Sequence, residues 1–441
     1  MTKTVKSTRN IPVVIAGIIG WAHDGFALVL VSLLAPTLMV AFGVDDIAIG
    51  FVFSAQYIMT VFGASFFGEL ADRFGRKNIL LLSVLWDSIF TAFSAFAPNF
   101  IIFAILRLIS GLGVSWGISF SLLSETFASE KRGMAGGLVH GTFVLGYIGA
   151  VLVTLILRPM TLTLGLLVLE GWRLCFLSAL FPIPFLLYLQ FALPESEVWS
   201  DFKEASEAQE DVVPESVRAL DILKGKWLKY TFLLTFLFWL SEFAYHALAD
   251  WAPTYLARVF TFSNGGNVEA ASQMSLVVML GIMIVAGVAL FVTGWASDYI
   301  GRRKAFISCA VIGLIGSALF FVFNFVTFAL PMVIIACLVL TLSFGMHGVF
   351  GVWSSETFPT RVRATATSLV FSIARGLSFG AFLVGLISTA LRPADYLTNP
   401  LGHAQALAVG MLLCVFAYIA LLIVPRLIPE TKGIDIAAIE E

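Results

Sequence analysis

The chain has 441 residues, of which 59% are hydrophobic and 12% are charged, with a formal net charge of −2 and a mean hydropathy of +0.96. A composition this apolar excludes a soluble domain and predicts an integral membrane protein. The charge excludes a nucleic-acid partner, because there is no broad basic face to neutralise phosphates.

The apolar runs are long enough to cross a bilayer, whose hydrocarbon core of about 30 Å requires roughly 20 residues of helix. We find twelve such runs, at 12–42, 48–69, 78–97, 99–124, 135–157, 171–193, 229–257, 272–297, 304–324, 327–355, 364–390 and 402–427. The first is too long for a signal-peptide core and has no evident cleavage site. The alternative, a β-barrel, would show short segments of alternating hydrophobicity, which are not seen. The sequence therefore predicts an all-α fold of twelve transmembrane helices.

The distribution of Lys and Arg predicts the orientation of these helices. Most basic residues fall on the side that holds both termini, whereas Arg158, Arg173, Arg258 and Arg392 fall on the opposite side. Because cytoplasmic loops are enriched in Lys and Arg, we expect a multi-pass protein of the plasma membrane with both termini in the cytoplasm.

Four cysteines lie singly inside apolar runs, at Cys175, Cys309, Cys337 and Cys414. They lack the paired spacing of a disulfide framework or a metal site, so we expect small buried apolar side chains. The sequence predicts neither a metal site nor a cofactor.

Three motifs of the first half recur in the second half, in the same order and at an almost constant separation. They are Gly68–Lys77 with Gly294–Arg303, Ser124–Phe127 with Ser355–Phe358, and Pro194–Ser196 with Pro429–Thr431. We therefore predict two pseudo-symmetric six-helix bundles, 1–193 and 229–441, joined by a charged cytoplasmic linker at 194–228. In transporters built from repeats, the substrate site lies between the repeats near the bilayer midplane.

Charged residues within the first six runs are candidates for function, because a charge at membrane depth is costly unless it is paired or wetted. Asp24 lies in the first run and Arg107 in the fourth. If these helices meet, we expect an ion pair that protonation of Asp24 would release, as proton symport requires. For Asp87 and His140 we expect packing or helix-end roles.

The seventh run carries Glu242, His246, Asp250 and Thr254 at intervals of four residues. A step of four residues advances about 400°, so these side chains are predicted to share one helix face. A histidine beside carboxylates can hold or pass a proton near physiological pH, which makes Glu242, His246 and Asp250 candidates for proton coupling. The alternative is a hydrogen-bonded cluster that only joins helices.

Arg375, near the middle of the eleventh run, is predicted to bind the carboxylate of a substrate, because a guanidinium fork matches a carboxylate. The alternative is a structural pairing with Asp250 or with a backbone carbonyl. Candidates for further substrate contacts are Thr254, Gln56, Tyr57 and His347, the last of which could equally serve packing.

The charged residues of the repeated motifs are predicted to form a gate. Salt bridges among them at the cytoplasmic helix ends would favour the outward-open state and break in the inward-open state. The alternative is that these charges only determine topology. The gating candidates are Asp72, Arg73, Arg76, Glu125 and Arg132 in the first half, and Asp298, Arg302, Glu356 and Arg363 in the second.

The loop motif G-x-L-x-D-R-x-G-R-K, read at Gly68–Lys77, is highly specific for the major facilitator superfamily, which the chain resembles over nearly its full length. The Glu-Thr-Phe…Arg patterns at 125–132 and 356–363, with Pro-Glu-Ser at 194–196 and Pro-Glu-Thr-Lys-Gly at 429–433, resemble its sugar-porter and metabolite:proton symporter branch. The resemblance implies the fold of that superfamily. It also implies that Asp24 is the protonation site and Arg107 its partner.

Within that branch, the lactate/pyruvate and sialate:proton symporters share the seventh-helix pattern N-x-x-S/T-H-x-S/T-Q-D-x-x-x-T. This chain keeps His246, Asp250 and Thr254 of the pattern, whereas its other four positions differ, namely Glu242, Tyr245, Leu248 and Ala249. The Gln-Gln pair and Asn of the sugar porters are absent from 238–243. The resemblance therefore implies an organic acid rather than a hexose.

We predict a monomeric proton-coupled symporter for a small organic acid, with lactate or pyruvate first and sialate or an aromatic acid next. In this hypothesis Asp24 carries the proton, His246 and Asp250 couple it to the substrate, and Arg375 holds the carboxylate. The expected partners are protons, the acid and the lipid bilayer. Alternatives among transporters are a sugar:proton symporter and a drug or aromatic-compound exporter.

Two other classes of protein are weaker alternatives. A non-transporting sensor on the same bundle would be expected to carry a long cytoplasmic tail, which this sequence lacks after its last apolar run. An intramembrane enzyme would be expected to show a His-rich metal cluster or a Ser/His/Asp grouping, and neither pattern is found. We therefore predict a protein that is not an enzyme.

Overall fold

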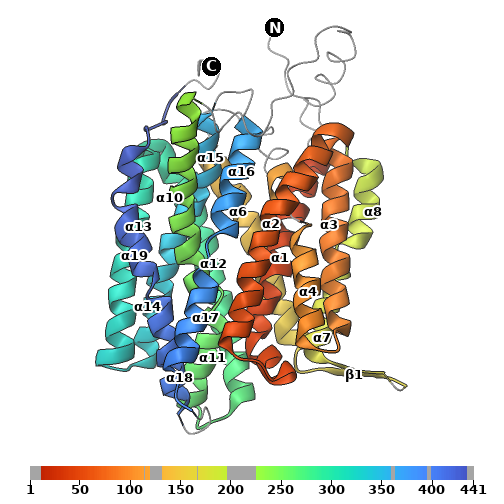
Figure 1. Ribbon diagram of the computed structural model, residues 1–441, viewed down its shortest axis with the longest axis vertical. Helices are drawn as coiled ribbons and strands as arrows, with labels where there is room; N and C mark the ends of the chain where they lie inside the picture. The colour runs from red at the N-terminus through yellow and green to blue at the C-terminus, as the bar shows by residue number, and fades with distance from the viewer. Residues whose placement is uncertain are drawn as a thin grey trace.

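The computed structural model describes residues 11–113, 115–119, 132–165, 167–195, 225–358, 363–394 and 399–434. The helices run roughly side by side along the long axis of the molecule (Figure 1). In the first half they are α1 (Ile11–Phe42), α2 (Asp46–Phe74), α3 (Arg76–Phe93), α4 (Phe100–Gly111), α6 (Arg132–Leu157), α7 (Gly171–Leu177) and α8 (Ile183–Ala192).

The second half begins with two helices that together form one membrane span. It contains α10 (Gly225–Ala249), α11 (Ala252–Ser263), α12 (Val268–Ile300), α13 (Arg302–Phe321), α14 (Leu330–Leu342), α15 (His347–Thr357), α16 (Arg363–Gly376), α17 (Gly380–Leu391), α18 (Pro400–Met411) and α19 (Cys414–Leu421). Short 3₁₀ turns and one π turn join several of these, among them η6 (Ser343–Met346).

Twelve stretches within the described residues are long and apolar enough to cross a membrane, which confirms the predicted number of spans. One feature was not predicted. A two-stranded antiparallel hairpin, β1 (Thr161–Leu164) and β2 (Leu167–Glu170), follows α6 and projects at the lower end of Figure 1. The expected linker at 194–228 lies mostly outside the described residues.

The repeated Pro-Glu motifs have the same structural role in both halves. The Glu195 carboxylate accepts hydrogen bonds from the backbone N–H groups of Arg76 (2.9 Å) and Lys77 (3.1 Å) at the start of α3. The Glu430 carboxylate likewise accepts from Arg302 (2.8 Å) and Arg303 (3.1 Å) at the start of α13. Each glutamate therefore satisfies free N–H groups at a helix N-terminus and complements its positive dipole end.

The two halves meet along α6 with α12 and α15, along α2 with α16 and α17, and along α1 with α11. Near its start, α6 approaches α12 through glycines. A Cβ added to Gly294 would lie 2.5 Å from the Gly133 carbonyl oxygen and 3.0 Å from the Cα of Gly137. The two backbones are thus in direct contact, as small residues permit between membrane helices.

Several spans that the sequence predicts as single helices are divided in the structure, and two of these interruptions bear on the site. The seventh run, expected at 229–257, ends as α10 at Ala249 and restarts as α11 at Ala252. Pro253 explains the break, because it has no N–H to donate to the Ala249 carbonyl and its ring clashes there. The eleventh run, expected at 364–390, is likewise interrupted between Gly376 and Gly380.

Candidate functional site

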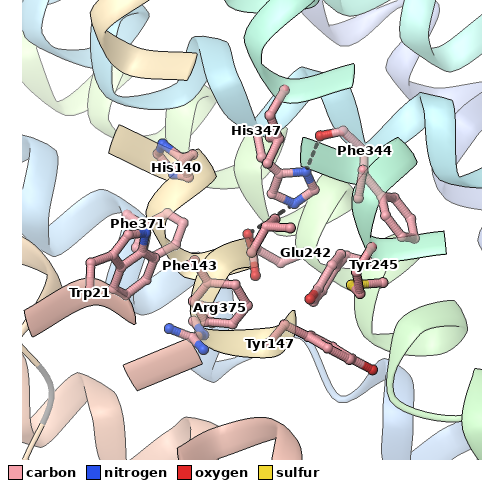
Figure 2. A pocket seen from close by; sticks show the side chains of 14 residues that line it. Trp21, His140, Phe143, Tyr147, Glu242, Tyr245, Phe344, His347, Phe371 and Arg375 are labelled. Carbon is pink, nitrogen blue, oxygen red and sulfur yellow. Dashed lines mark hydrogen bonds and ion pairs between the residues drawn. The ribbon is translucent and has the colours of Figure 1, made fainter. Parts of the chain in front are cut away.

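A cavity of about 560 Å³, including the part open to solvent, lies between the two halves (Figure 2). Its wall is mainly aromatic, with one carboxylate, one guanidinium and two imidazoles. The first half contributes Trp21, His140, Phe143, Val144 and Tyr147, and the second contributes Glu242, Tyr245, Met283, Ala286, Leu290, Phe344, His347, Phe371 and Arg375. The cavity is thus at the interface where the duplication predicts the substrate site.

Arg375 reaches this cavity without a partner of opposite charge. Its side chain is 3% exposed, its Nη1 has no hydrogen-bond partner, and it forms no ion pair with any described residue. Its guanidinium carbon instead lies 5.2 Å from the ring centre of Tyr57 and 5.7 Å from those of Trp21 and Phe143. Aromatic faces attract a cation but do not neutralise it. Arg375 is therefore a buried cation without a counter-charge among the described residues.

The interruption of the eleventh span positions this arginine. Arg375 is in the last turn of α16, and the chain then passes through Phe379, a non-glycine residue with φ of +44°. Two indole N–H groups from the seventh span bond to the backbone on either side of the break: Trp239 donates to the Leu377 carbonyl (2.7 Å) and Trp251 to the Ala381 carbonyl (2.8 Å). The Leu377 carbonyl follows the end of α16, where carbonyls lack an intrahelical partner, and the Trp239 bond satisfies it. The Trp251 bond is made to the first turn of α17.

Glu242, His246 and Asp250 form a connected chain of charged side chains, as their spacing predicts. His246 Nε2 lies 3.2 Å from Glu242 Oε2, and His246 Nδ1 lies 3.0 Å from Asp250 Oδ2. His347 extends the chain on one side, with Nε2 3.2 Å from Glu242 Oε1, and donates from Nδ1 to the Phe344 carbonyl (Figure 2). Since Glu242 and His347 line the cavity and the other two lie behind them, the chain leads from the cavity into the protein interior.

The far end of this chain crosses to the first half. Tyr57 of α2 donates its hydroxyl proton to Asp250 Oδ1 (3.0 Å), and Ser32 of α1 donates to the Asp250 backbone carbonyl (2.6 Å). Asp250 therefore does not pair with Arg375, which was the alternative considered for that arginine. Because the helix is interrupted at Asp250, its carbonyl is available to a hydroxyl of the opposite half.

Three of the predicted substrate contacts lie outside the cavity lining. Thr254 is in α11, beyond the break, and its buried hydroxyl has no hydrogen-bond partner. The Gln56 side chain is buried away from the cavity, and Tyr57 contacts Arg375 and Asp250 instead of lining it. The fourth, His347, lies in the cavity wall. The interruption of the seventh span explains the error for Thr254, since the single helix face that grouped it with Asp250 is broken.

The predicted ion pair between Asp24 and Arg107 is wrong for this structure. Arg107 donates to the hydroxyls of Thr91 (2.5 Å) and Ser110 (2.6 Å) and to the Ala27 carbonyl (3.2 Å). Asp24 Oδ2 accepts from the Ser115 N–H (3.0 Å), and its buried Oδ1 has no hydrogen-bond partner. The two helices do meet, but the side chains project toward different neighbours.

Asp87 belongs to the same first-half cluster as Arg107. Asp87 Oδ2 lies 3.5 Å from His23 Nε2, and Oδ1 accepts from the Thr91 hydroxyl (3.1 Å). Neither Asp87 nor His23 lines the cavity. This cluster is therefore satisfied largely within its own half.

At the upper end of Figure 1, the second-half gating candidates form an ion-pair network. Arg302 binds Glu356 with two bonds of 2.8 and 3.0 Å and contacts Asp298 at 2.6 Å. Asp298 also accepts hydrogen bonds from the N–H groups of Gly133 (3.0 Å) and Met134 (3.1 Å) at the start of α6. Among the described residues, a carboxylate on a helix N-terminus thus contributes to joining the halves here.

The other gating candidates are only partly covered by the structure. Arg76 is described, and its N–H binds Glu195 as given above. The side chains of Asp72, Arg73, Arg132 and Arg363, and the whole of Glu125, lie outside the described residues. Their predicted role in the gate stays a prediction.

The opposite end of the bundle carries ion pairs between the halves that sequence reasoning did not identify. Asp46 of α2 binds Arg258 of α11 through both carboxylate oxygens, with one bond of 2.9 Å, and accepts from the Ser388 hydroxyl of α17 (2.6 Å). Arg158, which directly follows α6, pairs with Glu269 of α12 at 2.6 Å. Arg158 and Arg258 had been used only as markers of topology. Described contacts therefore join the halves at both ends of the cavity.

His140, Tyr147 and Tyr245 line the cavity although the sequence analysis did not place them there. The spacing of His140, Phe143 and Tyr147 is that of one helix face, with intervals of three and four residues. That spacing was available as a signal, but His140 was assigned to packing as an isolated residue.

Comparison with known proteins identifies the family. The model of the Major Facilitator Superfamily matches residues 17–383. A probable 4-methylmuconolactone transporter of Cupriavidus pinatubonensis is 28% identical over 426 residues, which cover 96% of this chain and 91% of that protein. The sialic acid transporter NanX of Escherichia coli is 25% identical over 410 residues, which cover 92% of this chain and 90% of that protein.

Solved structures agree with this assignment. The proton:xylose symporter XylE of E. coli, bound to 6-bromo-6-deoxy-D-glucose, shares the fold with a TM-score of 0.73 at 18% identity, over 98% of both chains. The recognised resemblance, the twelve-span fold and the exclusion of an enzyme are thereby confirmed. The chain is a multi-pass membrane transporter and belongs to the Major Facilitator Superfamily.

Proposed function

We propose that this transporter carries a small ring-containing or unsaturated organic acid together with a proton, inward across the plasma membrane. The observation that carries the proposal is Arg375, a buried guanidinium without a carboxylate partner in an aromatic cavity. Leaving such a charge unpaired is costly, so its retention is best explained by an anion that visits the site.

The cavity wall supports a planar or ring acid in preference to lactate or pyruvate. Trp21, Phe143 and Phe371 present aromatic surface beside Arg375, as Figure 2 illustrates. A ring gains stacking and apolar contact on such a wall, whereas a three-carbon acid leaves most of it uncovered. The methylmuconolactone and sialic acid named for two relatives agree with an organic acid of this size. Lactate, the substrate that the sequence placed first, is therefore kept only as one of the compounds to be tested.

Two groups of residues support proton coupling. Asp24 is buried with one unpartnered carboxylate oxygen, so it remains the proposed protonation site even though Arg107 is not its partner. Glu242, His246 and Asp250 connect the substrate cavity to Tyr57 of the other half, so that a proton on this chain would alter contacts with both the substrate and the opposite bundle. The proton coupling named for XylE is consistent with this part of the proposal.

Alternating access follows from the contacts at the two ends. With the upper end of Figure 1 in the cytoplasm, as the positive-inside rule favours, Asp298 on the start of α6 is the inner gate. The pairs Asp46–Arg258 and Arg158–Glu269 are then the outer gate. Because both sets of contacts are formed here, we assign this arrangement to an occluded state. We further propose that the transporter functions as a monomer.

Uptake by proteoliposomes tests the proposal. Labelled benzoate, 4-hydroxybenzoate, cis,cis-muconate, sialate, lactate and glucose would each be offered with and without an imposed inward proton gradient. We expect ring or diene acids to accumulate and the gradient to increase that accumulation. Uptake of lactate or glucose alone would overturn the substrate class. Accumulation of a ring acid that ignores the proton gradient would overturn the coupling, and outward transport under the gradient would identify an exporter.

A further inference from the structure

Besides Arg375, several residues that line the cavity carry polar atoms without a hydrogen-bond partner among the described residues, and His140 is one of them. His140 of α6 is 5% exposed, and its Nε2 makes no hydrogen bond with any described residue. Its neighbours are aromatic: the ring centres of Phe350 and Phe371 lie 6.1 Å away, and that of Trp116 lies 6.2 Å away. A buried polar atom that the protein leaves unsatisfied in a cavity is a site for a ligand or for water.

The other ring nitrogen determines what His140 can bind. Nδ1 lies 3.4 Å from the carbonyl oxygen of Gly136, one turn earlier in α6. Because a carbonyl oxygen can only accept, Nδ1 carries the proton in this contact, and Nε2 of the neutral ring presents a lone pair. His140 is therefore arranged to accept a hydrogen bond from a donor group in the cavity.

Trp21 connects His140 with Arg375. The Trp21 ring centre lies 6.3 Å from the imidazole centre of His140 and 5.7 Å from the guanidinium carbon of Arg375. In Figure 2 the two polar groups lie on opposite sides of Trp21 and Phe143. A single six-membered ring placed against these aromatic side chains can direct a carboxylate toward Arg375 and a substituent on its far side toward His140.

We propose that His140 is a specificity-determining residue, which accepts a hydrogen bond from a hydroxyl group on the ring of the transported acid. The inference rests on the proposed function and narrows its substrate class to ring acids with a hydroxyl on the side away from the carboxylate. A site built around such a bond discriminates against an analogue without the donor, because the buried acceptor is then left unpaired. We expect kcat/KM for 4-hydroxybenzoate or 3-hydroxybenzoate to exceed that for benzoate by about 10- to 100-fold.

The test compares these acids in proteoliposomes of the wild type, His140→Leu and His140→Gln. We expect His140→Leu to reduce the preference to within about threefold, and His140→Gln to keep part of the preference through its amide oxygen. As a matched ligand, 4-methoxybenzoate keeps the ring oxygen but cannot donate, so it should behave like benzoate in the wild type.

Several results would overturn the inference. A wild type that transports benzoate and hydroxybenzoates equally would remove the role of His140 while leaving the proposed function intact. Loss of all ring acids together in a folded His140→Gln protein would assign His140 to packing or to proton transfer instead. A wild type that transports no ring acid would contradict the proposed function itself. Where His140→Leu fails to fold, the ratio measured for His140→Gln decides between these outcomes.

Discussion

The two halves of the bundle hold their buried charges in different ways. In the first half, Arg107 is surrounded by hydroxyls and a carbonyl, and Asp87 lies beside His23, so that these two charges are largely satisfied close to where they originate. Asp24 is the exception in this half, because its Oδ1 has no hydrogen-bond partner. In the second half, Arg375 forms no ion pair with a described residue, and the Glu242–His246–Asp250 chain faces the cavity and extends to Tyr57. We propose that the charges with incomplete pairing, or with pairing that spans both halves, are the ones that take part in transport.

The largest expected effect separates the two arginines. Arg375→Gln should weaken substrate binding by about 100-fold, because it removes charge-assisted hydrogen bonds to the carboxylate, and Arg375→Lys should fall between. Arg107→Gln should lower the thermal unfolding temperature but change the affinity of the folded protein by less than about threefold. Equilibrium binding and thermal unfolding of each purified variant provide the measurement. The comparison fails if Arg107→Gln folds normally and does not bind substrate.

The next largest effect distinguishes the carboxylates of Asp24 and Glu242 from that of Asp87. Glu242→Gln and Asp24→Asn should each abolish accumulation driven by a proton gradient while substrate exchange continues, since exchange needs no net proton movement. Asp87→Asn, in the cluster that is satisfied within the first half, should keep the response to the gradient. Parallel uptake and counterflow assays measure both quantities. Full gradient-driven accumulation by Asp24→Asn would remove Asp24 from the mechanism.

A third prediction compares the two ion pairs of the lower end. Asp46 and Arg258 are buried, whereas the Glu269 side chain is 66% exposed. Removing one partner of a buried pair costs about 3–5 kcal/mol, and an exposed pair contributes about 0–1 kcal/mol. Asp46→Asn should therefore raise the ratio of outward-open to occluded protein more than tenfold, and Glu269→Gln should raise it only a few fold.

Spin labels at Val40 and Asn264, exposed positions at this end in opposite halves, would measure the opening as a change in their distance distribution. An equal shift in Asp46→Asn and Glu269→Gln would contradict the assignment of the buried pair as the main outer contact.

The smallest effect concerns the hydrogen bond at the helix break. Ser32→Ala removes the donor to the Asp250 carbonyl, which should cost about 1 kcal/mol and change transport rates by less than about tenfold. Ser263→Ala, which removes a hydroxyl bonded within α11, is the matched control and should have no measurable effect on transport. Initial uptake rates suffice for this comparison.

Much of the fold could be predicted because the length and the apolar content of each span can be read directly from the sequence. The twelve spans and the duplication needed only hydropathy and the repeated motifs. The interruption at Asp250 was also readable, since Pro253 is incompatible with a continuous helix there. The interruption after Gly376 was not, because it depends on Phe379 in a left-handed conformation and on a Trp239 hydrogen bond from another helix.

The sequence predicted which ionisable residues lie at membrane depth, but not the direction in which their side chains point. Arg375, Glu242 and His347 could be selected because ionisable groups are rare in apolar runs. Whether two such groups meet depends on the rotation of each helix about its axis, which the sequence of one helix does not determine. Asp24 and Arg107 illustrate this, since they lie on neighbouring helices but bind Ser115 and Thr91 respectively.

The glycine contact between α6 and α12 affects the speed of the transport cycle as well as its geometry. Interlocked side chains must change rotamer before two helices can separate, and each such change adds to the kinetic barrier. Where Gly133 and Gly137 meet Gly294, the contact is formed by backbone atoms. No side chains have to disengage there before the two helices slide or separate. We propose that opening at this end is then limited chiefly by release of the Asp298 carboxylate from the N–H groups at the start of α6.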